Sequence, residues 1–275
     1  MNDTTNLKTL ENNLKERIKS LDSVIVAYSG GVDSSLLAFY ADLELKHKAL
    51  IAIAVSPSLA SFELEFAKQQ AQKFNWPIYE IITTETTSSE YQENNLNRCY
   101  ICKSTLFTEL TQLAKEKNIQ NIIYGANLDD LNDFRPGHKA AYEFNIIAPL
   151  IDCKLNKKQI RELAKLNNLP SADKPQSACL SSRFPTYIKI SDTKLATIDK
   201  AEKFLHDLGF KQVRVRHHDE LARIELDSDE ISKLLENENS LKLITEYFKS
   251  LGYKFVTLDL NGYRMGSSVV TAGKN

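Results

Sequence analysis

The sequence predicts an α/β protein, in which a doubly wound, mostly parallel sheet is followed by a smaller C-terminal α+β domain. Two observations predict this class. From residue 21 to about residue 149, short apolar runs alternate with segments whose apolar residues recur at the helical period. After a polar stretch near residue 180, the order changes to a helix, two adjacent strands, two helices and a final strand. We expect domains at 1–170 and 191–275, joined by an interdomain loop over 171–190.

The first domain is built from four expected strands and the helices that connect them. The strands are predicted at 24–28, 50–55, 78–82 and 121–125, and the helices at 33–46, 59–74, 102–117 and 156–168. The last helix begins at Asn156, a residue type that caps helix N-termini well. This alternation favours a parallel sheet covered on both faces, with ligands bound at the carboxyl ends of its strands.

The stretch from Pro170 to Thr186 shows no apolar period, contains three prolines and carries Cys179. A loop of this length in a compact protein is usually functional or disordered. Beyond it, helices are predicted at 191–208, 228–236 and 240–250, and strands at 212–217, 221–226 and 254–260. The two adjacent strands are expected to form a hairpin, and the unit to have a ferredoxin-like layout.

The bulk composition limits the partners of the protein. Its 275 residues carry 35 basic and 36 acidic side chains, so no overall positive field attracts nucleic acid. No apolar run approaches the roughly 20 residues of a membrane span, and the N-terminal segment is polar with a helical period, unlike a signal peptide. We therefore expect a cytoplasmic protein that acts on a small molecule, with no nucleic acid and no membrane partner. A helix-rich surface favours a homo-oligomer.

The most informative local pattern is the turn Ser29-Gly30-Gly31-Val32-Asp33-Ser34-Ser35, which follows the first apolar run and opens a helix. Glycine lets the backbone approach a phosphate closely, and the N–H groups and dipole of a helix N-terminus hold negative charge. The carboxylate of Asp33 can organise Mg²⁺, and the serine hydroxyls can bond phosphate oxygens. The lysine of a Walker A loop is missing. The turn instead resembles the PP-loop of ATP pyrophosphatases, which cleave ATP to AMP and pyrophosphate.

Four cysteines in a protein expected to be cytoplasmic favour metal-binding or catalytic roles over disulfides. Cys99 and Cys102 form a CxxC pair at the start of a helix, a position that favours the thiolate. The pair is compatible with a redox couple, half of a zinc site or part of an iron–sulfur site. With Cys179 as a third thiolate, the set could hold three irons of a [4Fe–4S] cluster and leave the fourth open. Cys153 is expected to be a structural, small apolar residue.

Motifs over nearly the whole chain resemble one family, the LarE-type ATP-dependent sulfur transferases of nickel-pincer nucleotide biosynthesis. The matching stretches are Tyr28 to Ser35, Arg98-Cys99 with Cys102-Lys103, Gly125-Ala126-Asn127 with Asp129-Asp130, Arg135-Pro136-Gly137, Ala178-Cys179-Leu180 with Ser182-Arg183, Val213-Arg214-Val215-Arg216-His217, and Gly262-Tyr263-Arg264 with Gly266-Ser267. The combination is specific, because other PP-loop families would not share it. The resemblance implies an adenine nucleotide alpha hydrolase-like fold for the first domain.

The resemblance also implies an activity. Such an enzyme adenylates a carboxylate of pyridinium-3,5-biscarboxylic acid mononucleotide, releases AMP and pyrophosphate, and leaves a thiocarboxylate. Some members give up the sulfur of the cysteine that matches Cys179, whereas others bind a [4Fe–4S] cluster through three cysteines. Because Cys99 and Cys102 accompany Cys179, the chain matches the cluster type. The expected cofactors are therefore ATP, Mg²⁺ and a [4Fe–4S] cluster, with these three cysteines as metal ligands.

The nucleotide-binding residues are expected at the carboxyl ends of the strands. The ATP-binding set is Ser29, Gly30, Gly31, Asp33, Ser34, Ser35, Val55 and Gly125. Within it, Val55 would meet the adenine, and Gly125 would let the ribose or α-phosphate approach. Asp33 and Cys179 are the expected catalytic residues. Asp129 and Asp130 either help to hold metal or cap a loop.

The mononucleotide substrate needs an anchor for its phosphate. Arg214 and Arg216 alternate on one predicted strand, so their side chains point to the same face and could grip one phosphate. Ser182 and Arg183 join them by resemblance. The alternative without a function is that Arg214 and Arg216 are ordinary charged residues on a solvent-exposed strand face.

Three other functions stay open from the sequence. A PP-loop tRNA thiolase would also use ATP and cysteine, but it needs a basic surface or an RNA-binding module. An amide-forming enzyme of the NAD or GMP synthetase type needs an ammonia source, and no glutaminase signature precedes the glycine turn. A non-enzymatic nucleotide sensor would bind ATP through the turn and zinc through the cysteines. Release of AMP separates the sensor from the enzymes.

Overall fold

The computed structural model describes residues 2–132 and 136–264. The chain divides into two compact units. Unit 1 comprises Met1–Ser56, Glu63–Glu85 and Cys99–Ser177, and unit 2 comprises Pro57–Phe62, Thr86–Arg98 and Ala178–Asn275. The division is not contiguous in sequence, since two short early segments belong to unit 2. The functional domain boundaries at 1–170, 171–190 and 191–275 stay a prediction.

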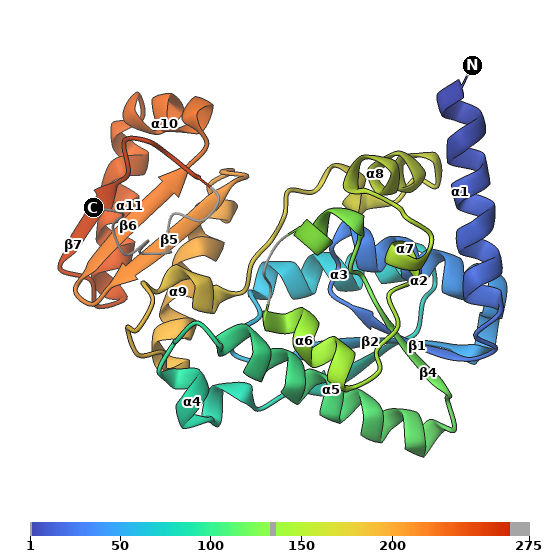
Figure 1. Ribbon diagram of the computed structural model, residues 1–275. Helices are drawn as coiled ribbons and strands as arrows, with labels where there is room; N and C mark the ends of the chain where they lie inside the picture. Colours follow the sequence, from blue (N-terminus) through green and yellow to red (C-terminus); the bar gives the residue numbers. More distant parts are fainter. Residues whose placement is uncertain (1, 133–135, 265–275) are drawn as a thin grey trace, which may run out of the picture. The chain divides into compact units, whose positions relative to one another are not determined.

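Unit 1 is built on a four-stranded parallel sheet in the order β3-β2-β1-β4 (Figure 1). The strands are β1 (Val24–Tyr28), β2 (Ala49–Val55), β3 (Ile78–Ile82) and β4 (Asn121–Tyr124). The strand order reverses at β1, which has β2 on one side and β4 on the other. Ligands bind at such a switch point in open α/β sheets. The predicted α/β class with a parallel sheet is confirmed.

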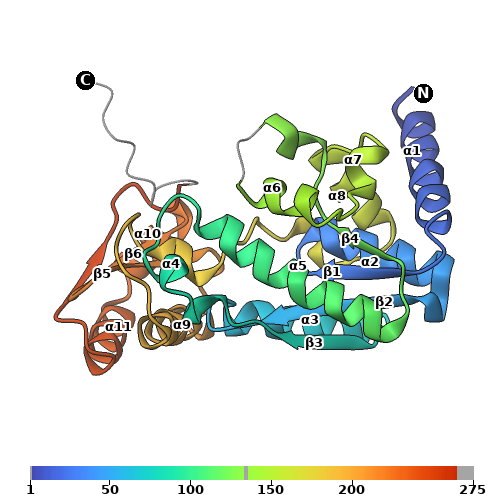
Figure 2. The ribbon, with the colours of Figure 1, turned by 60° about the horizontal axis from the view of Figure 1, so that its bottom comes forward.

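Helices cover both faces of this sheet (Figures 1 and 2). Consecutive residues of β1 point to opposite faces, as in any strand. Val24 and Val26 pack in a core with α1 (Asn2–Lys19), α2 (Val32–Leu45), α3 (Ser61–Lys73) and α8 (Lys157–Leu166). Ile25 packs in a second core with α5 (Arg98–Lys117) and α6 (Pro136–Glu143). Short α7 (Pro149–Asp152) adds Leu150 to the first core.

Unit 2 contains a three-stranded sheet in the order β5-β6-β7, formed by β5 (Val213–His218), β6 (Leu221–Leu226) and β7 (Phe255–Leu258). Its helices are α4 (Ser89–Gln92), α9 (Asp192–Asp207), α10 (Ser228–Leu235) and α11 (Glu238–Ser250). The hairpin of β5 and β6 and the α+β class are confirmed. The ferredoxin-like layout is wrong for the part of the chain described, because the sheet has three strands and β7 pairs with β6 in parallel. The two helices between β6 and β7 form a crossover, which parallel pairing requires.

The predicted loop of residues 170–186 is an ordered segment. It contains two short 3₁₀ helices, η4 (Pro170–Asp173) and η5 (Leu180–Arg183). Within unit 2, the Leu180 N–H donates to Ser58 O at 2.8 Å, and the Tyr91 hydroxyl bonds Ser181 Oγ at 2.6 Å. The Asn94 amide donates to Pro185 O at 2.8 Å. These bonds explain why segments 57–62 and 86–98 belong to unit 2.

Over the described ranges, no helix combines the length and the apolar character needed to cross a membrane.

Candidate functional site

The glycine turn lies at the carboxyl end of β1 and leads into α2. Gly30 has a φ of +72°, a conformation that side-chain-bearing residues rarely adopt. A Cβ on Gly30 would also lie 2.8 Å from the Cβ of Ala67 in α3. Gly31 is the N-cap of α2, and a glycine has no side chain with which to cap the first turn of the helix. The backbone N–H groups at this end of α2 therefore suit an anion as their acceptor.

The serine hydroxyls shape the turn. Ser34 Oγ accepts from the Ser29 N–H at 3.1 Å, lies 3.0 Å from Ser29 Oγ and donates to Gly31 O at 3.1 Å. Ser35 is fully buried; its hydroxyl donates to Gly31 O at 2.7 Å and accepts from the Gln70 amide at 2.6 Å. The hydroxyls of Ser34 and Ser35 thus both donate to the Gly31 carbonyl and fix the conformation of the turn.

Asp33 stands in the first turn of α2 and has two polar partners in unit 1. Asn127, just after β4, donates its amide to Asp33 Oδ1 at 3.3 Å. Lys157 forms an ion pair with Asp33 Oδ2. The turn therefore has a lysine beside it, although the lysine lies 124 residues further along the chain. Sequence reasoning missed Lys157 because helix periodicity predicts α8 but not what its first residue faces.

The start of α8 is fixed by several polar contacts. Asn156 and Gln159 form a capping box at its N-terminus. The Lys157 N–H donates to Asp129 Oδ2 at 2.8 Å, and Asp130 Oδ2 accepts from the Asn127 N–H at 3.0 Å. The acidic residues after β4 therefore serve a scaffold that places Asn127 and Lys157 around Asp33. This favours the capping interpretation of Asp129 and Asp130 over the metal-binding one.

The other two predicted nucleotide-binding residues lie at neighbouring strand ends. A Cβ on Gly125, just after β4, would lie 2.8 Å from Ser34 N. The absent side chain at Gly125 is therefore required by the close approach of α2 itself. Val55 ends β2, and its carbonyl accepts from the Thr83 N–H at 3.1 Å. Both residues lie at the carboxyl ends of their strands, as the glycine turn does, which is the arrangement predicted for a parallel sheet.

The cysteines fall into different units. Cys99 is exposed and Cys102 half-buried; they are the second and fifth residues of α5, three residues apart and so on one side of the helix. Cys179 is half-buried and precedes η5 in unit 2. Among the described residues, no group of three or more His, Cys, Asp or Glu side chains is placed to hold a metal ion. Cys153 packs against the core of unit 1, where burial and then Asp152 raise the pKa of its thiol. This placement agrees with a structural role.

The two arginines of β5 are almost fully buried, at 5 % exposed for Arg214 and 4 % for Arg216. The Arg214 guanidinium lies 5.2 Å from the ring centre of Tyr263. Burial lowers the pKa of Arg214, and the positive charge of Arg183 lowers it further. Arg216 donates to Ser182 O at 2.9 Å and to Glu225 at 2.8 Å. Ser182 and Arg216 are therefore neighbours, as the resemblance implied.

Positive charge gathers around β5. Arg183 pairs with Glu202, Arg216 and Arg223 pair with Glu225, and Arg223 also lies 3.6 Å from Asp259. With Arg214, these described side chains comprise four guanidinium groups and three carboxylates, a balance of one positive charge. Three of these arginines, Arg183, Arg214 and Arg216, are buried, and buried positive charge favours an anion as ligand. Sequence reasoning found Arg183, Arg214 and Arg216, but it missed Arg223 and the carboxylates that pair with these arginines.

Arg183 differs from the other predicted phosphate ligands. Its side chain is fully buried, and two of its nitrogens donate to the carboxylate of Glu202 at 2.9 and 2.8 Å. The Arg183 guanidinium adds positive charge to its surroundings, and it donates hydrogen bonds to protein acceptors. The prediction that Arg183 binds the substrate phosphate stays a prediction.

Comparisons with known proteins agree with this geometry. Residues 7–96 match the family model described as asparagine synthase. An uncharacterized protein of Synechocystis sp. is 42% identical over 254 residues, covering 92% of this chain and 94% of the relative. An uncharacterized protein of Methanocaldococcus jannaschii is 37% identical over 257 residues, covering 93% of this chain and 96% of the relative.

A third relative has a functional name. The pyridinium-3,5-bisthiocarboxylic acid mononucleotide synthase of Lactiplantibacillus plantarum is 31% identical over 261 residues, and the match covers 94% of each chain. The similarity extends over the parallel sheet with its glycine turn and over the sheet that carries the buried arginines. The chain therefore belongs to the family of this synthase, the LarE-type PP-loop proteins.

Proposed function

We propose that the protein is an ATP-dependent sulfur transferase that converts a carboxylate of pyridinium-3,5-biscarboxylic acid mononucleotide to a thiocarboxylate. The observation that carries the proposal is the glycine turn with Asp33 and Lys157 beside it, in a chain that matches the named synthase over 94% of its length. The substrate is a small molecule, which agrees with a net charge of −1.

The first step activates the carboxylate. A carboxylate oxygen attacks the α-phosphorus of ATP, the bond to the β-phosphate breaks, and pyrophosphate leaves. Charge develops on the leaving group, so stabilisation requires donors and cations fixed in place before the reaction. The N–H groups at the start of α2 and the ammonium of Lys157 would bind the pyrophosphate oxygens. Mg²⁺, which the Asp33 carboxylate would help to hold, would neutralise further charge.

The second step replaces AMP by sulfur. A sulfur nucleophile attacks the acyl carbon of the adenylate, the carbon–sulfur bond forms, and the bond to AMP breaks. The proposed sulfur site is Cys179. Cys99 and Cys102, on one side of the N-terminal end of α5, would act with Cys179 as ligands of a [4Fe–4S] cluster, and such a cluster would supply the sulfide that attacks. The alternative is that the Cys179 thiolate itself attacks the acyl carbon and displaces AMP. Removal of the Cα proton of Cys179 then breaks its Cβ–S bond, which releases the thiocarboxylate and leaves dehydroalanine at position 179.

The sulfur source is tested by single replacements of the cysteines. Replacing Cys99, Cys102 or Cys179 by alanine is expected to remove the iron and to abolish thiocarboxylate formation, because three thiolates hold the cluster together. The measurements are iron and sulfide content after anaerobic purification, and the mass of the Cys179 peptide after turnover. Cys153→Ala is the matched control and should keep both iron and activity.

Two outcomes would contradict the cluster assignment. Dehydroalanine at position 179, with one turnover intact in Cys99→Ala, would assign the sulfur to Cys179 itself. Loss of iron in Cys153→Ala would show that the ligand set is wrong.

The arginines of β5 are proposed to bind the substrate phosphate. Arg214→Ala or Arg216→Ala is expected to weaken mononucleotide binding about 30-fold, since a desolvated charged contact is worth ~2 kcal/mol. ATP affinity should stay within about twofold. Isothermal titration with each ligand measures both, and Lys254→Ala, an exposed cation of unit 2, is the control. An equal loss of ATP affinity would argue against this role.

Amide formation is the second candidate function, because residues 7–96 match the asparagine synthase model. Ammonia attacking the same acyl adenylate would give a carboxamide. Mass analysis of the product distinguishes a carboxamide from a thiocarboxylate.

A further inference from the structure

The backbone around Cys179 is held on both sides by one buried side chain. Arg183 Nη1 donates to Ala178 O at 2.7 Å and to Cys179 O at 3.1 Å. These carbonyls belong to the peptide groups before and after the Cys179 Cα. The next N–H, that of Leu180, donates to Ser58 O at 2.8 Å. With both flanking peptides fixed, the direction of the Cys179 Cα–Cβ bond is fixed, and only the side-chain torsion is left to set the sulfur position.

Arg183 is held in turn by Glu202 of α9. Both side chains are fully buried, and the carboxylate accepts from Nε at 2.9 Å and from Nη2 at 2.8 Å. Burial alone would raise the pKa of Glu202, but the charge and hydrogen bonds of Arg183 outweigh burial and lower it. The pair is therefore ionised and bidentate, the geometry that fixes a guanidinium most firmly.

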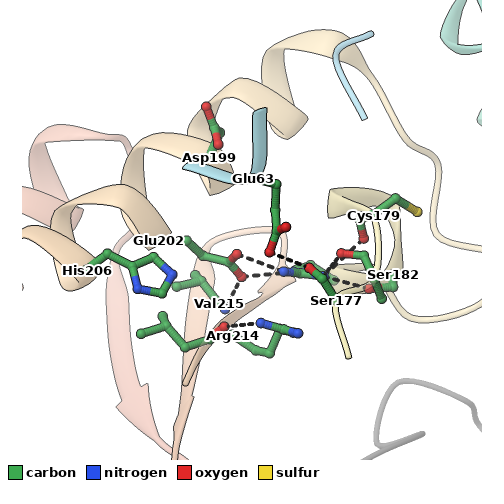
Figure 3. Close-up of polar contacts among 12 residues, drawn as sticks. Glu63, Ser177, Cys179, Ser182, Asp199, Glu202, His206, Arg214 and Val215 are labelled. Carbon is green, nitrogen blue, oxygen red and sulfur yellow. Dashed lines mark hydrogen bonds and ion pairs between the residues drawn. The ribbon is translucent and has the colours of Figure 1, made fainter. Parts of the chain in front are cut away.

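Glu202 also reaches the strand of the buried arginines. Its Oε1 accepts from the Val215 N–H at 2.8 Å, at the residue between Arg214 and Arg216 (Figure 3). One continuous set of buried hydrogen bonds thus runs from Cys179 through Arg183 and Glu202 to β5. Figure 3 shows the Cys179 sulfur directed away from Glu202, so the thiol itself takes no part in these hydrogen bonds.

We propose that Arg183 and Glu202 are positioning residues that fix the Cys179 sulfur relative to the arginines of β5. The proposal rests on the proposed function, in which Cys179, as a cluster ligand or as the sulfur donor itself, lies where sulfur is delivered to an acyl adenylate whose mononucleotide phosphate those arginines bind. A misplacement of about 1 Å between reacting atoms costs up to ~10²-fold in rate. The pair would therefore control the transfer of sulfur, whereas the formation of AMP depends on the glycine turn of unit 1.

Glu202→Gln tests the proposal most directly. It keeps the shape of the side chain but removes the charge that holds Arg183. We expect thiocarboxylate formed per AMP to fall ~10-fold or more, while AMP formation stays within about threefold. Glu230→Gln is the matched control, because Glu230 is another carboxylate of unit 2 that accepts from backbone N–H groups, those of Lys211 and Gln212. It should leave the ratio unchanged.

Glu202→Gln leaves a buried cation without its carboxylate and could fail to fold, so a second variant is needed. Arg183→Met combined with Glu202→Gln removes both charges, a change that buried pairs often tolerate. If the pair serves stability alone, the double variant should recover the ratio of thiocarboxylate to AMP. If the pair positions Cys179, the double variant folds and the ratio stays low.

A nitroxide label on Cys179 separates this proposal from the proposed function. In a background with Cys99, Cys102 and Cys153 replaced by serine, the label should be immobilised, and it should become mobile in Glu202→Gln and in the double variant. This result needs no turnover, so it stands even if the enzyme forms no thiocarboxylate. Equal label mobility in the parent and both variants would overturn the positioning role.

Discussion

Asp33→Ala is expected to lower AMP formation by ~10²- to 10³-fold while the protein stays folded. Asp33 stands in the first turn of α2, where its carboxylate is bonded to Asn127 and Lys157 and belongs to the polar site, outside the apolar core. Its removal takes away the proposed Mg²⁺ ligand and releases the Lys157 ammonium. Both effects weaken stabilisation of the departing pyrophosphate. The measurement is AMP release with ATP, Mg²⁺ and the mononucleotide, together with the melting temperature.

Asp173→Ala is the control for this variant. Asp173 also forms an ion pair with a lysine of α8, Lys165, but the pair is exposed. Surface pairs of this kind contribute about 0–1 kcal/mol to stability. AMP release should be unchanged in Asp173→Ala. Normal AMP release from Asp33→Ala would remove Asp33 from the site.

Lys157→Met is expected to reduce AMP formation by about 10²-fold or more. Lys157 supplies a positive charge beside a turn that has no lysine of its own, and methionine keeps most of the unbranched side chain without the charge. Lys158→Met is a sharp control because the residue is adjacent in sequence and highly exposed, with its ammonium 3.9 Å from the Glu162 carboxylate. AMP release and ATP affinity measured for both variants decide the role.

Combining Asp33→Ala with Lys157→Met tests whether Asp33 and Lys157 act together. Because the two side chains contact each other, the combined variant should lose little more than the worse single variant. Equal losses in Lys157→Met and Lys158→Met would indicate a general effect of surface charge. If the fold-loss of AMP formation in the combined variant equals the product of the two single fold-losses, the residues act independently.

Local patterns in the amino-acid sequence were enough to predict the fold class and the position of the nucleotide turn. Alternating apolar runs and helical periods predicted all four strands of the unit 1 sheet and the hairpin of unit 2. The turn was readable because glycine is the residue that tolerates the φ of +72° at Gly30. The motifs around the cysteines and the arginines of β5 likewise depend on short spacings, so the family could be inferred from the amino-acid sequence alone.

Which charged groups meet could be learned only from the folded chain. Nothing in the sequence around Lys157 indicates that it contacts Asp33, since such a contact between distant residues carries no period. Arg183 was predicted as a phosphate ligand, but nothing in the sequence indicated that its side chain also bonds Glu202 and the backbone at Cys179. The parallel pairing of β7 with β6 was likewise set by the crossover of α10 and α11. Whether a charge is solvated, paired or buried depends on partners far along the chain, and only folding brings those partners together.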